Sequence, residues 1–197
     1  MKSICVYCGS ANQASRKYFL AARWMGETLV RKGLTLVYGG GRTGLMGALA
    51  DSVLEQGGQV IGVIVASMNT PELAHTRLTR LEVEPTIHQR KARMYALADG
   101  YIALPGGYGT LDELFETLTW AQIGEHHKPV GILNVDGYYD SMLELLDRAV
   151  ADKFIFPEHR QSLLCEIEPE KLLDAMANHH YPHEAAQRWM RQDERTK

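Results

Sequence analysis

The chain has 197 residues, of which 45% are hydrophobic and 23% are charged, and its formal net charge at pH 7 is -3. A chain of this length buries roughly 70% of its unfolded surface, so we expect one domain over residues 1–197 that needs neither a metal nor disulfides. The balanced charge disfavours a nucleic acid polymer as partner, and no apolar run approaches the about 18 residues of a membrane span. These features predict a cytoplasmic protein whose polar last residues, 187–197, are frayed.

Short apolar segments alternate with helical patterns along the chain. Strands are predicted at residues 3–7, 34–38, 60–65, 81–83, 101–104 and 130–134, with a weaker candidate at 163–167. Helices are predicted at 14–31, 45–56, 87–98, 111–122, 139–152 and 170–179. Near-continuous apolar strands separated by helices are typical of an α/β fold, a Rossmann-like doubly wound parallel sheet with helices on both faces. In such sheets ligands bind at the carboxyl ends of the strands.

Three of the predicted strand ends carry glycine. They are C-G-S at 8–10, G-G-G-R-T-G-L-M-G at 39–47 and P-G-G-Y-G-T-L-D-E at 105–113. The last run joins a buried strand to a helix, and glycine lets the backbone approach a ligand closely. Because the free N–H groups and the dipole of a helix start favour anions, this run predicts a phosphate site. We expect all three turns to face one crevice.

The second glycine run matches the dinucleotide fingerprint G-x-G-x-x-G. A nicotinamide enzyme normally places Asp or Glu for the ribose about 20 residues on, at the end of the next strand. Here that strand ends V-A-S-M at 65–68, which disfavours an NAD oxidoreductase. The absence of G-x-x-x-x-G-K-[ST] disfavours P-loop hydrolysis of ATP. The alternative is that these glycines serve only the packing of a helix on the sheet.

Glu113 has two interpretations. With Thr110 three residues before it, it matches a capping box, in which the glutamate only satisfies an amide at the helix start. Otherwise its carboxylate is catalytic. Asp112 and Glu116 have the same ambiguity, because acids in this position complement the helix dipole or lie at the surface.

A basic segment opens the helix predicted at 87–98. Arg90 shares a helix face with Arg93 and Met94, while Lys91 is rotated by about 100° from Arg90. Three basic residues near a helix start oppose its dipole, so a nearby anion would help to hold them there. The alternative is a solvated helix face with Met94 directed to the core.

The cysteines and histidines predict no metal site. Cys5 and Cys8 spell C-x-x-C, but at i and i+3 of a strand they lie on opposite faces, about 10 Å apart, and should not form a disulfide. The histidines are predicted to be solvated surface residues. His126-His127 falls in a predicted loop, and the histidines at 179, 180 and 183 surround Pro182, which breaks any helix face.

Together these motifs resemble the Lonely Guy family of cytokinin-activating phosphoribohydrolases, which are often labelled lysine decarboxylases. The resemblance rests on P-G-G-Y-G-T-L-D-E, R-K-A-R-M and G-G-G-R-T-G-L-M-G, and it spans roughly residues 2–153. It implies a Rossmann-like homodimer with active sites at or near the subunit interface. It also implies hydrolysis of N6-substituted adenosine 5'-monophosphates to the free base and ribose 5-phosphate, without a metal or redox cofactor.

The resemblance assigns roles residue by residue. The family's catalytic arginine falls on Arg90 and its catalytic glutamate on Glu113. Its nucleotide contacts fall on Glu72, Lys91, Gly107, Tyr108, Gly109, Thr110, Leu111, Asp112 and Thr119. The chain departs from the family pattern at two places: Asp112 stands where many relatives have glutamate, and Ala74-His75 stands where a small residue and glycine are usual. The second departure weakens the assignment of Glu72.

The implied chemistry fits these residue types. Cleavage of an N-glycosidic bond builds positive charge on the ribose and negative charge on the departing purine. A Glu113 carboxylate near C1' could stabilise that cation and orient the attacking water, while Arg90 could stabilise the charge on the base or fix the nucleotide.

Other functions remain open from the sequence. They are a non-catalytic nucleotide carrier or sensor, and a general nucleoside monophosphate nucleosidase that acts on AMP. Lysine decarboxylation has no support, because nothing marks a lysine as a pyridoxal phosphate site. A homodimer is also expected because Trp120, Met94 and Met46 near the motifs predict an apolar patch that a monomer would expose.

Overall fold

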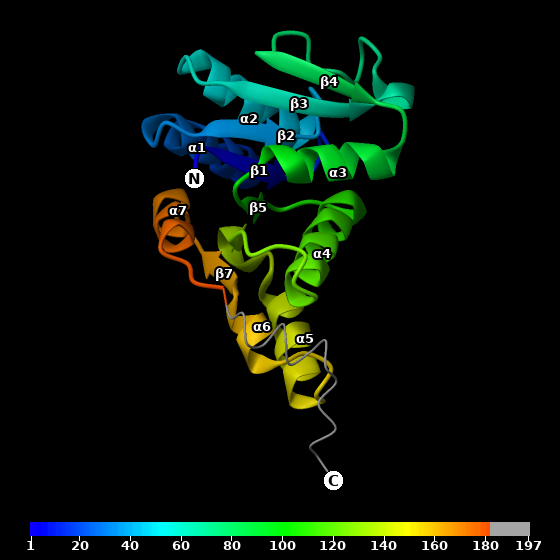
Figure 1. The fold of residues 1–197 in the computed structure, drawn as a ribbon. Helices are drawn as coiled ribbons and strands as arrows, with labels where there is room; N and C mark the ends of the chain where they lie inside the picture. Colours follow the sequence, from blue (N-terminus) through cyan, green and yellow to red (C-terminus); the bar gives the residue numbers. More distant parts are fainter. Residues whose placement is uncertain (182–197) are drawn as a thin grey trace.

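A single seven-stranded sheet organises the computed structural model, which describes residues 1–181. All strand pairs are parallel, and the strands lie in the order β4-β3-β2-β1-β5-β6-β7, from β4 at the top of Figure 1 to β7 below. Their bounds are Ser3–Tyr7 (β1), Thr35–Tyr38 (β2), Val60–Val65 (β3), Arg80–Glu84 (β4), Tyr101–Ala103 (β5), Val130–Leu133 (β6) and Leu163–Glu166 (β7). The predicted tail at 187–197 lies outside the described residues.

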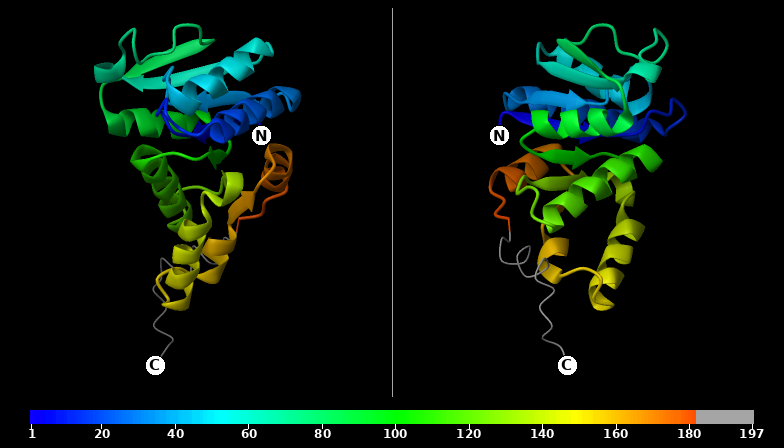
Figure 2. Two further views of the ribbon diagram at one scale, coloured as in Figure 1. Left: turned by 180° about the vertical axis from the view of Figure 1, so that it is seen from behind. Right: turned by 45° about the vertical axis from the view of Figure 1, so that its right-hand side comes forward.

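Helices cover both faces of the sheet (Figures 1 and 2). The helices are α1 (Arg16–Arg31), α2 (Gly44–Glu55), α3 (Ile87–Leu97), α4 (Tyr108–Gln122), α5 (Asp140–Ala151), α6 (Pro157–Gln161) and α7 (Pro169–Ala177), with 3-10 turns η1 (Ala66–Met68) and η2 (Val135–Gly137). Helices α1, α2 and α7 pack on one face, and α3, α4 and α5 pack on the other. The predicted Rossmann-like, doubly wound α/β fold is therefore confirmed.

The apolar strands follow from this two-sided cover. Every residue of β6 is buried, and so are four of the five residues of β1, because a strand covered on both faces has no polar side. Helix α1 buries Ala21, Ala22, Met25 and Leu29, a stripe at helical spacing. Gly26 lets α1 approach α2, since a Cβ there would lie 2.9 Å from the Ser52 Cβ.

The sheet order creates a crevice beside β1. The chain adds strands outward from β1 to β4, then returns to place β5 on the other side of β1. The loops after β1 and β5 therefore lead to α1 on one face of the sheet and to α4 on the other, and α/β sheets bind ligands at the carboxyl ends of such strands. The two loops touch: the Gly9 N–H donates to the Pro105 carbonyl at 3.1 Å, and a Cβ on Gly9 would lie 3.3 Å from the Gly106 Cα.

Helix boundaries differ from the prediction where local signals are weak. Helix α4 begins at Tyr108, three residues before the predicted start, because it takes in Gly109, a poor helix former that apolar periodicity does not mark. The short helix α6 was not predicted. It begins with Pro157, a residue suited to the first helical position, but five residues are too few for periodicity to show.

The prediction that Cys5 and Cys8 form no disulfide is confirmed. The prediction that the histidines are solvated surface residues is wrong in part. Cys5 and Cys8 are buried and free. His75, His126 and His159 are buried rather than solvated; the His126 imidazole, for example, lies 2.9 Å from the Thr117 carbonyl oxygen through Nε2. Loop position alone does not predict exposure when the loop folds back on a helix. Within residues 1–181, no group of three or more potential ligands is arranged for a metal, and no helix has the length and apolarity to cross a membrane.

Candidate active site

A cleft of about 410 Å³ opens at the carboxyl ends of β1, β2 and β5. This volume lies in the range of small-molecule sites. All three glycine turns contribute to its wall, as predicted from the sequence. The cleft is lined by Val6, Tyr7, Cys8, Gly9, Ser10, Gly39, Gly41, Thr43, Met46, Ile64, Met68, Leu73, Ile87, Arg90, Gly107, Tyr108, Gly109, Thr110 and Glu113.

Arg90 of α3 and Glu113 of α4 meet in this cleft. The Arg90 Nη1 donates to the Glu113 Oε1 at 3.0 Å, and the Arg90 Nε donates to the Val63 carbonyl at 2.9 Å. Each side chain is only 13% exposed. Gly39 makes room for the arginine, because a Cβ at that position would overlap the guanidinium. The end of β2 and the end of β3 therefore fix the guanidinium against the carboxylate.

Burial and the neighbouring arginine act on the pKa of the Glu113 carboxyl in opposite directions. Burial raises the pKa of the Glu113 carboxyl above its ordinary value, and the charge and hydrogen bond of Arg90 oppose that rise. The capping-box interpretation is wrong. Gly107 is the N-cap of α4, so Thr110 lies inside the helix and Glu113 points into the cleft rather than to the helix start. The carboxylate is thus available to a ligand.

The start of α4 forms the floor beside that carboxylate. As the first residues of a helix, 107–110 have N–H groups without intrahelical partners. The glycines of this turn differ in whether the fold itself requires them. A Cβ at Gly106 would overlap the Thr110 side chain, whereas a Cβ at Gly107 or Gly109 would meet nothing within 4 Å. The fold therefore does not require glycine at 107 and 109, and their lack of side chains leaves space in front of the helix start.

The other basic residues of α3 have carboxylate partners outside the cleft. The Lys91 Nζ lies 3.1 Å from the Asp112 Oδ2 and 2.9 Å from the Glu116 Oε1. Burial alone would lower the pKa of Lys91, but these two partners outweigh burial and raise it. Arg93 forms a bidentate pair with Glu82. The anion expected near the basic segment is thus partly supplied by the protein.

Five of the sequence-predicted contacts lie outside the cleft wall. Lys91 and Asp112 pair with each other, and Leu111 packs against the core on the face of α3 and α4. Thr119 lines a separate cavity of about 160 Å³ with side chains of α4, α5 and α6. Glu72 is exposed on the loop between η1 and β4, although the next residue, Leu73, lines the cleft.

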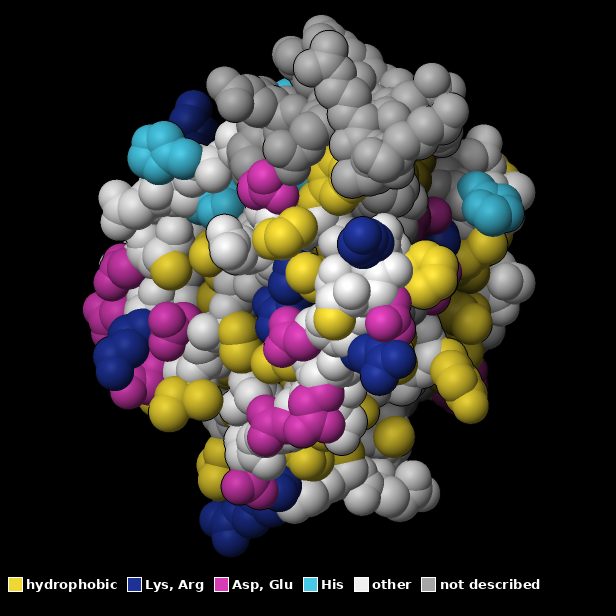
Figure 3. Space-filling model, turned by 90° about the horizontal axis from the view of Figure 1, so that it is seen from below, with side chains coloured by type: hydrophobic (Ala, Val, Ile, Leu, Met, Phe, Trp, Pro, Cys, Tyr) yellow, Lys and Arg dark blue, Asp and Glu magenta, His cyan; other side chains and the backbone are white. Residues whose placement is uncertain are grey.

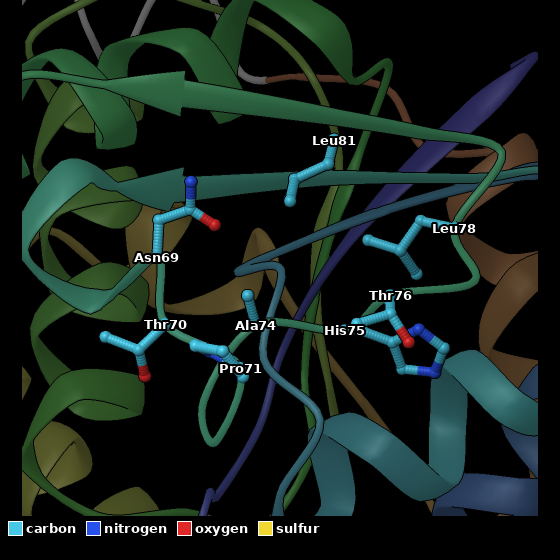
Figure 4. Close-up of a pocket in the computed structure, with 8 residues that line it drawn as sticks. All are labelled: Asn69, Thr70, Pro71, Ala74, His75, Thr76, Leu78 and Leu81. Atoms are coloured by element: carbon cyan, nitrogen blue, oxygen red, sulfur yellow. The ribbon is translucent and has the colours of Figure 1, made fainter.

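The loop that carries Glu72 is fixed to the second glycine turn. The His75 N–H donates to the Gly40 carbonyl, and the Arg42 N–H donates to the Leu73 carbonyl, both at 2.9 Å. The His75 imidazole lies 3.2 Å from the Asp51 carboxylate of α2. This histidine also lines a separate cavity of about 330 Å³. Figure 4 shows it together with the other residues that line that cavity. The departure at Ala74-His75 thus has a structural role, since it anchors the loop.

The second glycine run serves both packing and the cleft. Gly44 has φ +59°, and a Cβ there would lie too close to the Ser10 backbone; a Cβ on Gly47 would overlap the Arg42 backbone. The packing alternative therefore holds for these two glycines, while Gly39 and Gly41 line the cleft.

Sequence reasoning missed the apolar wall of the cleft. It consists of Met46, Ile64, Met68, Leu73 and Ile87, which come from four separate parts of the chain. Met68, Leu73 and Ile87 remain 53%, 42% and 44% exposed, respectively. No sequence pattern links these residues, and their exposure, unusual for such side chains, appears only in the structure.

Comparisons with known proteins identify the relatives of this chain. A family model described as possible lysine decarboxylase matches residues 46–176. A probable cytokinin riboside 5'-monophosphate phosphoribohydrolase of Oryza sativa subsp. japonica is 46% identical over 175 residues, which cover 89% of this chain and 83% of the relative. A cytokinin riboside 5'-monophosphate phosphoribohydrolase of Arabidopsis thaliana is 47% identical over 163 residues, which cover 83% of this chain and 75% of the relative.

Solved structures share the fold at lower identity. The molybdenum cofactor binding protein of Rippkaea orientalis matches with a TM-score of 0.67 and 22% identity, over 90% of this chain and 96% of that chain. The molybdenum cofactor carrier protein of Chlamydomonas reinhardtii matches with a TM-score of 0.67 and 18% identity, over 89% and 96%. At these identities the likeness concerns the fold alone. The relatives with 46% and 47% identity show that the chain belongs to the Lonely Guy family of cytokinin riboside 5'-monophosphate phosphoribohydrolases.

Proposed function

We propose that the protein hydrolyses the N-glycosidic bond of N6-substituted adenosine 5'-monophosphates and releases the free base and ribose 5-phosphate. One observation carries the proposal: a buried, arginine-paired carboxylate, Glu113, lies in the same cleft as the open helix start at Gly107 and Gly109. The names of relatives at 46% and 47% identity give the substrate class.

The phosphate is assigned to the start of α4. The unpaired N–H groups at 107–110 and the helix dipole favour an anion, and the space left by Gly107 and Gly109 admits it. With the phosphate there, the ribose lies toward Glu113 and Arg90, deeper in the cleft.

Bond cleavage is assigned to Glu113 and Arg90. As the bond between C1' and the base nitrogen breaks, its electron pair leaves with the base and positive charge grows on the ribose. The Glu113 carboxylate stabilises that charge and accepts a proton from the attacking water, whose oxygen bonds to C1'. The departing base takes up a proton, and Arg90 stabilises its negative charge or holds the nucleotide.

The base is assigned to the apolar wall. Met46, Met68, Leu73 and Ile87 offer a surface that suits a purine with an apolar N6 substituent. This wall favours the N6-substituted nucleotide over plain AMP, because an unsubstituted amine would place both of its N–H donors against apolar side chains without a polar partner.

We also propose a homodimer in which Thr119 and Glu72 contact the nucleotide bound by the other copy. Thr119 lines its own cavity rather than the cleft of its chain, which supports a contact with a nucleotide bound by a second copy. The apolar patch expected from the sequence is wrong for two of its three members, because Met94 is 1% exposed and Met46 lines the cleft, whereas Trp120 is half-buried.

Other apolar side chains support the dimer instead. Phe115 of α4, Leu145 of α5 and Phe154 are 37%, 64% and 73% exposed. Figure 3, which views the end of the molecule that carries α5 and α6, shows hydrophobic side chains there among charged ones. Contiguous apolar patches mark interaction surfaces, and the proposal is that these side chains belong to one.

The family label of lysine decarboxylase finds no support in the cleft. Among residues 1–181, no lysine lines the cleft, and the amine of the nearby Lys91 is held by two carboxylates. A Schiff-base lysine needs an amine that can reach a carbonyl and lose its proton, whereas these partners raise the pKa of Lys91.

Base release measured with four substrates tests the proposal. They are AMP, N6-isopentenyl-AMP and the two corresponding nucleosides without the 5'-phosphate. We expect free base mainly from N6-isopentenyl-AMP and little from either nucleoside. Equal rates for the two nucleotides would favour a general nucleosidase, and tight nucleotide binding without base release would favour a carrier or sensor.

The cytoplasmic location stays a prediction.

A further inference from the structure

The turn proposed to bind the phosphate is supported by a hydrogen bond from the connection that follows β6. Tyr138 follows η2, in the connection between β6 and α5, and its hydroxyl donates to the Gly106 carbonyl at 2.6 Å. This is a short, well-formed hydrogen bond for a hydroxyl donor. It joins the loop after β6 to the turn after β5.

We propose that Tyr138 is a positioning residue of the phosphate site: its hydroxyl fixes the Gly106–Gly107 peptide so that the Gly107 N–H faces the 5'-phosphate. The inference rests on the proposed function, which places the phosphate at the start of α4. Tyr138 is absent from the wall of the cleft, so it acts through the peptide rather than by touching the nucleotide.

The need for such a support follows from the glycines. A peptide between two glycines rotates more easily than any other, because both flanking residues accept φ of either sign. In a planar trans peptide the carbonyl and the next N–H point in opposite directions. A bond from Tyr138 to the Gly106 oxygen therefore directs the Gly107 N–H away from Tyr138. The proposal places the phosphate on that side of Gly107, which lines the cleft.

The tyrosine is itself held in place. Its ring makes edge contacts with the rings of Tyr18 and Tyr139, at centroid distances of 5.5 and 5.1 Å. Aromatic rings favour this edge-to-face arrangement. Gly106 is closely surrounded, since a Cβ there would overlap the Thr110 Oγ1 and lie 2.8 Å from the Gly9 nitrogen. The hydroxyl thus restrains a peptide whose neighbours are already fixed.

Tyr139 offers a matched control. Its hydroxyl donates to the Leu104 carbonyl at 2.7 Å, two residues before Gly106, and its side chain is 1% exposed. Both tyrosines therefore donate to carbonyls of the same segment. Only the Tyr138 hydroxyl donates to the peptide group that also carries the Gly107 N–H. Removal of either hydroxyl leaves the ring in place.

The test compares Tyr138→Phe and Tyr139→Phe with the wild type. For Tyr138→Phe we expect KM for N6-isopentenyl-AMP to rise about 3- to 10-fold, the effect of one lost hydrogen bond, with kcat within about twofold. The kcat/KM for the nucleoside without phosphate should not change. Tyr139→Phe should lower Tm and leave KM within about twofold.

Calorimetric titration with ribose 5-phosphate separates this inference from the proposed function. We expect Kd to rise for Tyr138→Phe by the same factor as KM and to stay unchanged for Tyr139→Phe. Equal losses with and without the substrate phosphate, or an unchanged Kd, would overturn the role of Tyr138. A wild-type protein that binds ribose 5-phosphate but releases no base would overturn the proposed function alone. The ratio of the Kd of Tyr138→Phe to that of the wild type would still test the role of Tyr138.

Discussion

Arg90 and Glu113 form an ion pair across the cleft, with 3.0 Å between Nη1 and Oε1, from helices on the same face of the sheet. The arginine is also bound to the Val63 carbonyl, so it stays in place if the carboxylate turns to a ligand. Removal of one member of a buried pair leaves the other charge uncompensated. A substitution of either residue therefore changes both the charge in the cleft and the stability of the fold. For this reason activity and stability are measured for each variant.

Glu113→Gln should lower kcat by about 100-fold or more, because the amide has nearly the same size but no negative charge to stabilise the cationic transition state. Nucleotide binding and folding should survive, since the amide oxygen can still accept from Arg90. Steady-state assays of base release, together with calorimetric binding and a thermal melt, measure all three.

Glu55→Gln is the matched control for that substitution. Glu55 pairs with Arg23 in the same way, but at the surface, where both side chains are about half exposed. Surface pairs contribute little to stability, so this variant should retain wild-type turnover. Near wild-type base release by folded Glu113→Gln protein would overturn the mechanism and favour a binding protein.

Arg90→Ala should also depress turnover, about 10-fold or more, because the site loses a charge-assisted hydrogen bond. If Arg90 and Glu113 act as one unit, the double variant should lose less than the product of the two single effects. A double-mutant cycle on kcat measures this coupling. Strictly multiplicative losses would indicate that the two residues act independently.

The pH dependence of kcat should show the raised pKa of Glu113. Burial raises this pKa above its ordinary value, and catalysis requires the carboxylate, so kcat should fall as pH decreases through that raised value. Arg90 opposes the rise, so Arg90→Ala should move the acid limb to higher pH. Saturating substrate is needed, because the phosphate itself titrates near pH 6. An acid limb that Arg90→Ala leaves in place would show that Glu113 is not the titrating group.

Gly109→Ala tests whether the glycine turn is kept for a ligand. A Cβ at this position would meet nothing within 4 Å, and alanine is the better helix former, so Tm should stay the same or rise. KM for the nucleotide should nevertheless increase several-fold, because the methyl group enters the space proposed for the phosphate. Unchanged KM would place the phosphate elsewhere.

The fold was predictable because its signals are local. Apolar strands such as 130–133 and the stripe of α1 are visible in any short window of sequence, and two-sided burial explains both. The start of α4 could not be predicted in this way. Gly109 is a poor helix former, yet it lies inside the helix, which begins at Tyr108.

The site was predictable only in part, because its contacts are not local. The sequence marks Arg90 and Glu113 as candidates, but their pairing depends on how α3 and α4 pack on the sheet. The burial of His126 depends likewise on a loop that returns to the Thr117 carbonyl. The apolar wall is a third case, because Met68 of η1 and Ile87 of α3 line the same cleft only in the folded chain.

A shared active site should be detectable by mixing inactive variants. Light scattering should first give about twice the chain mass of 22.1 kDa. Thr119→Trp and Glu113→Gln should each abolish most turnover as homodimers, if Thr119 serves the cleft of the other copy. In a mixed dimer, one of the two sites then has an intact Thr119 and an intact Glu113. Random mixing on coexpression should therefore restore about a quarter of wild-type activity, since half of the dimers are mixed. A mass of a single chain, or mixed dimers without recovered activity, would rule out this arrangement.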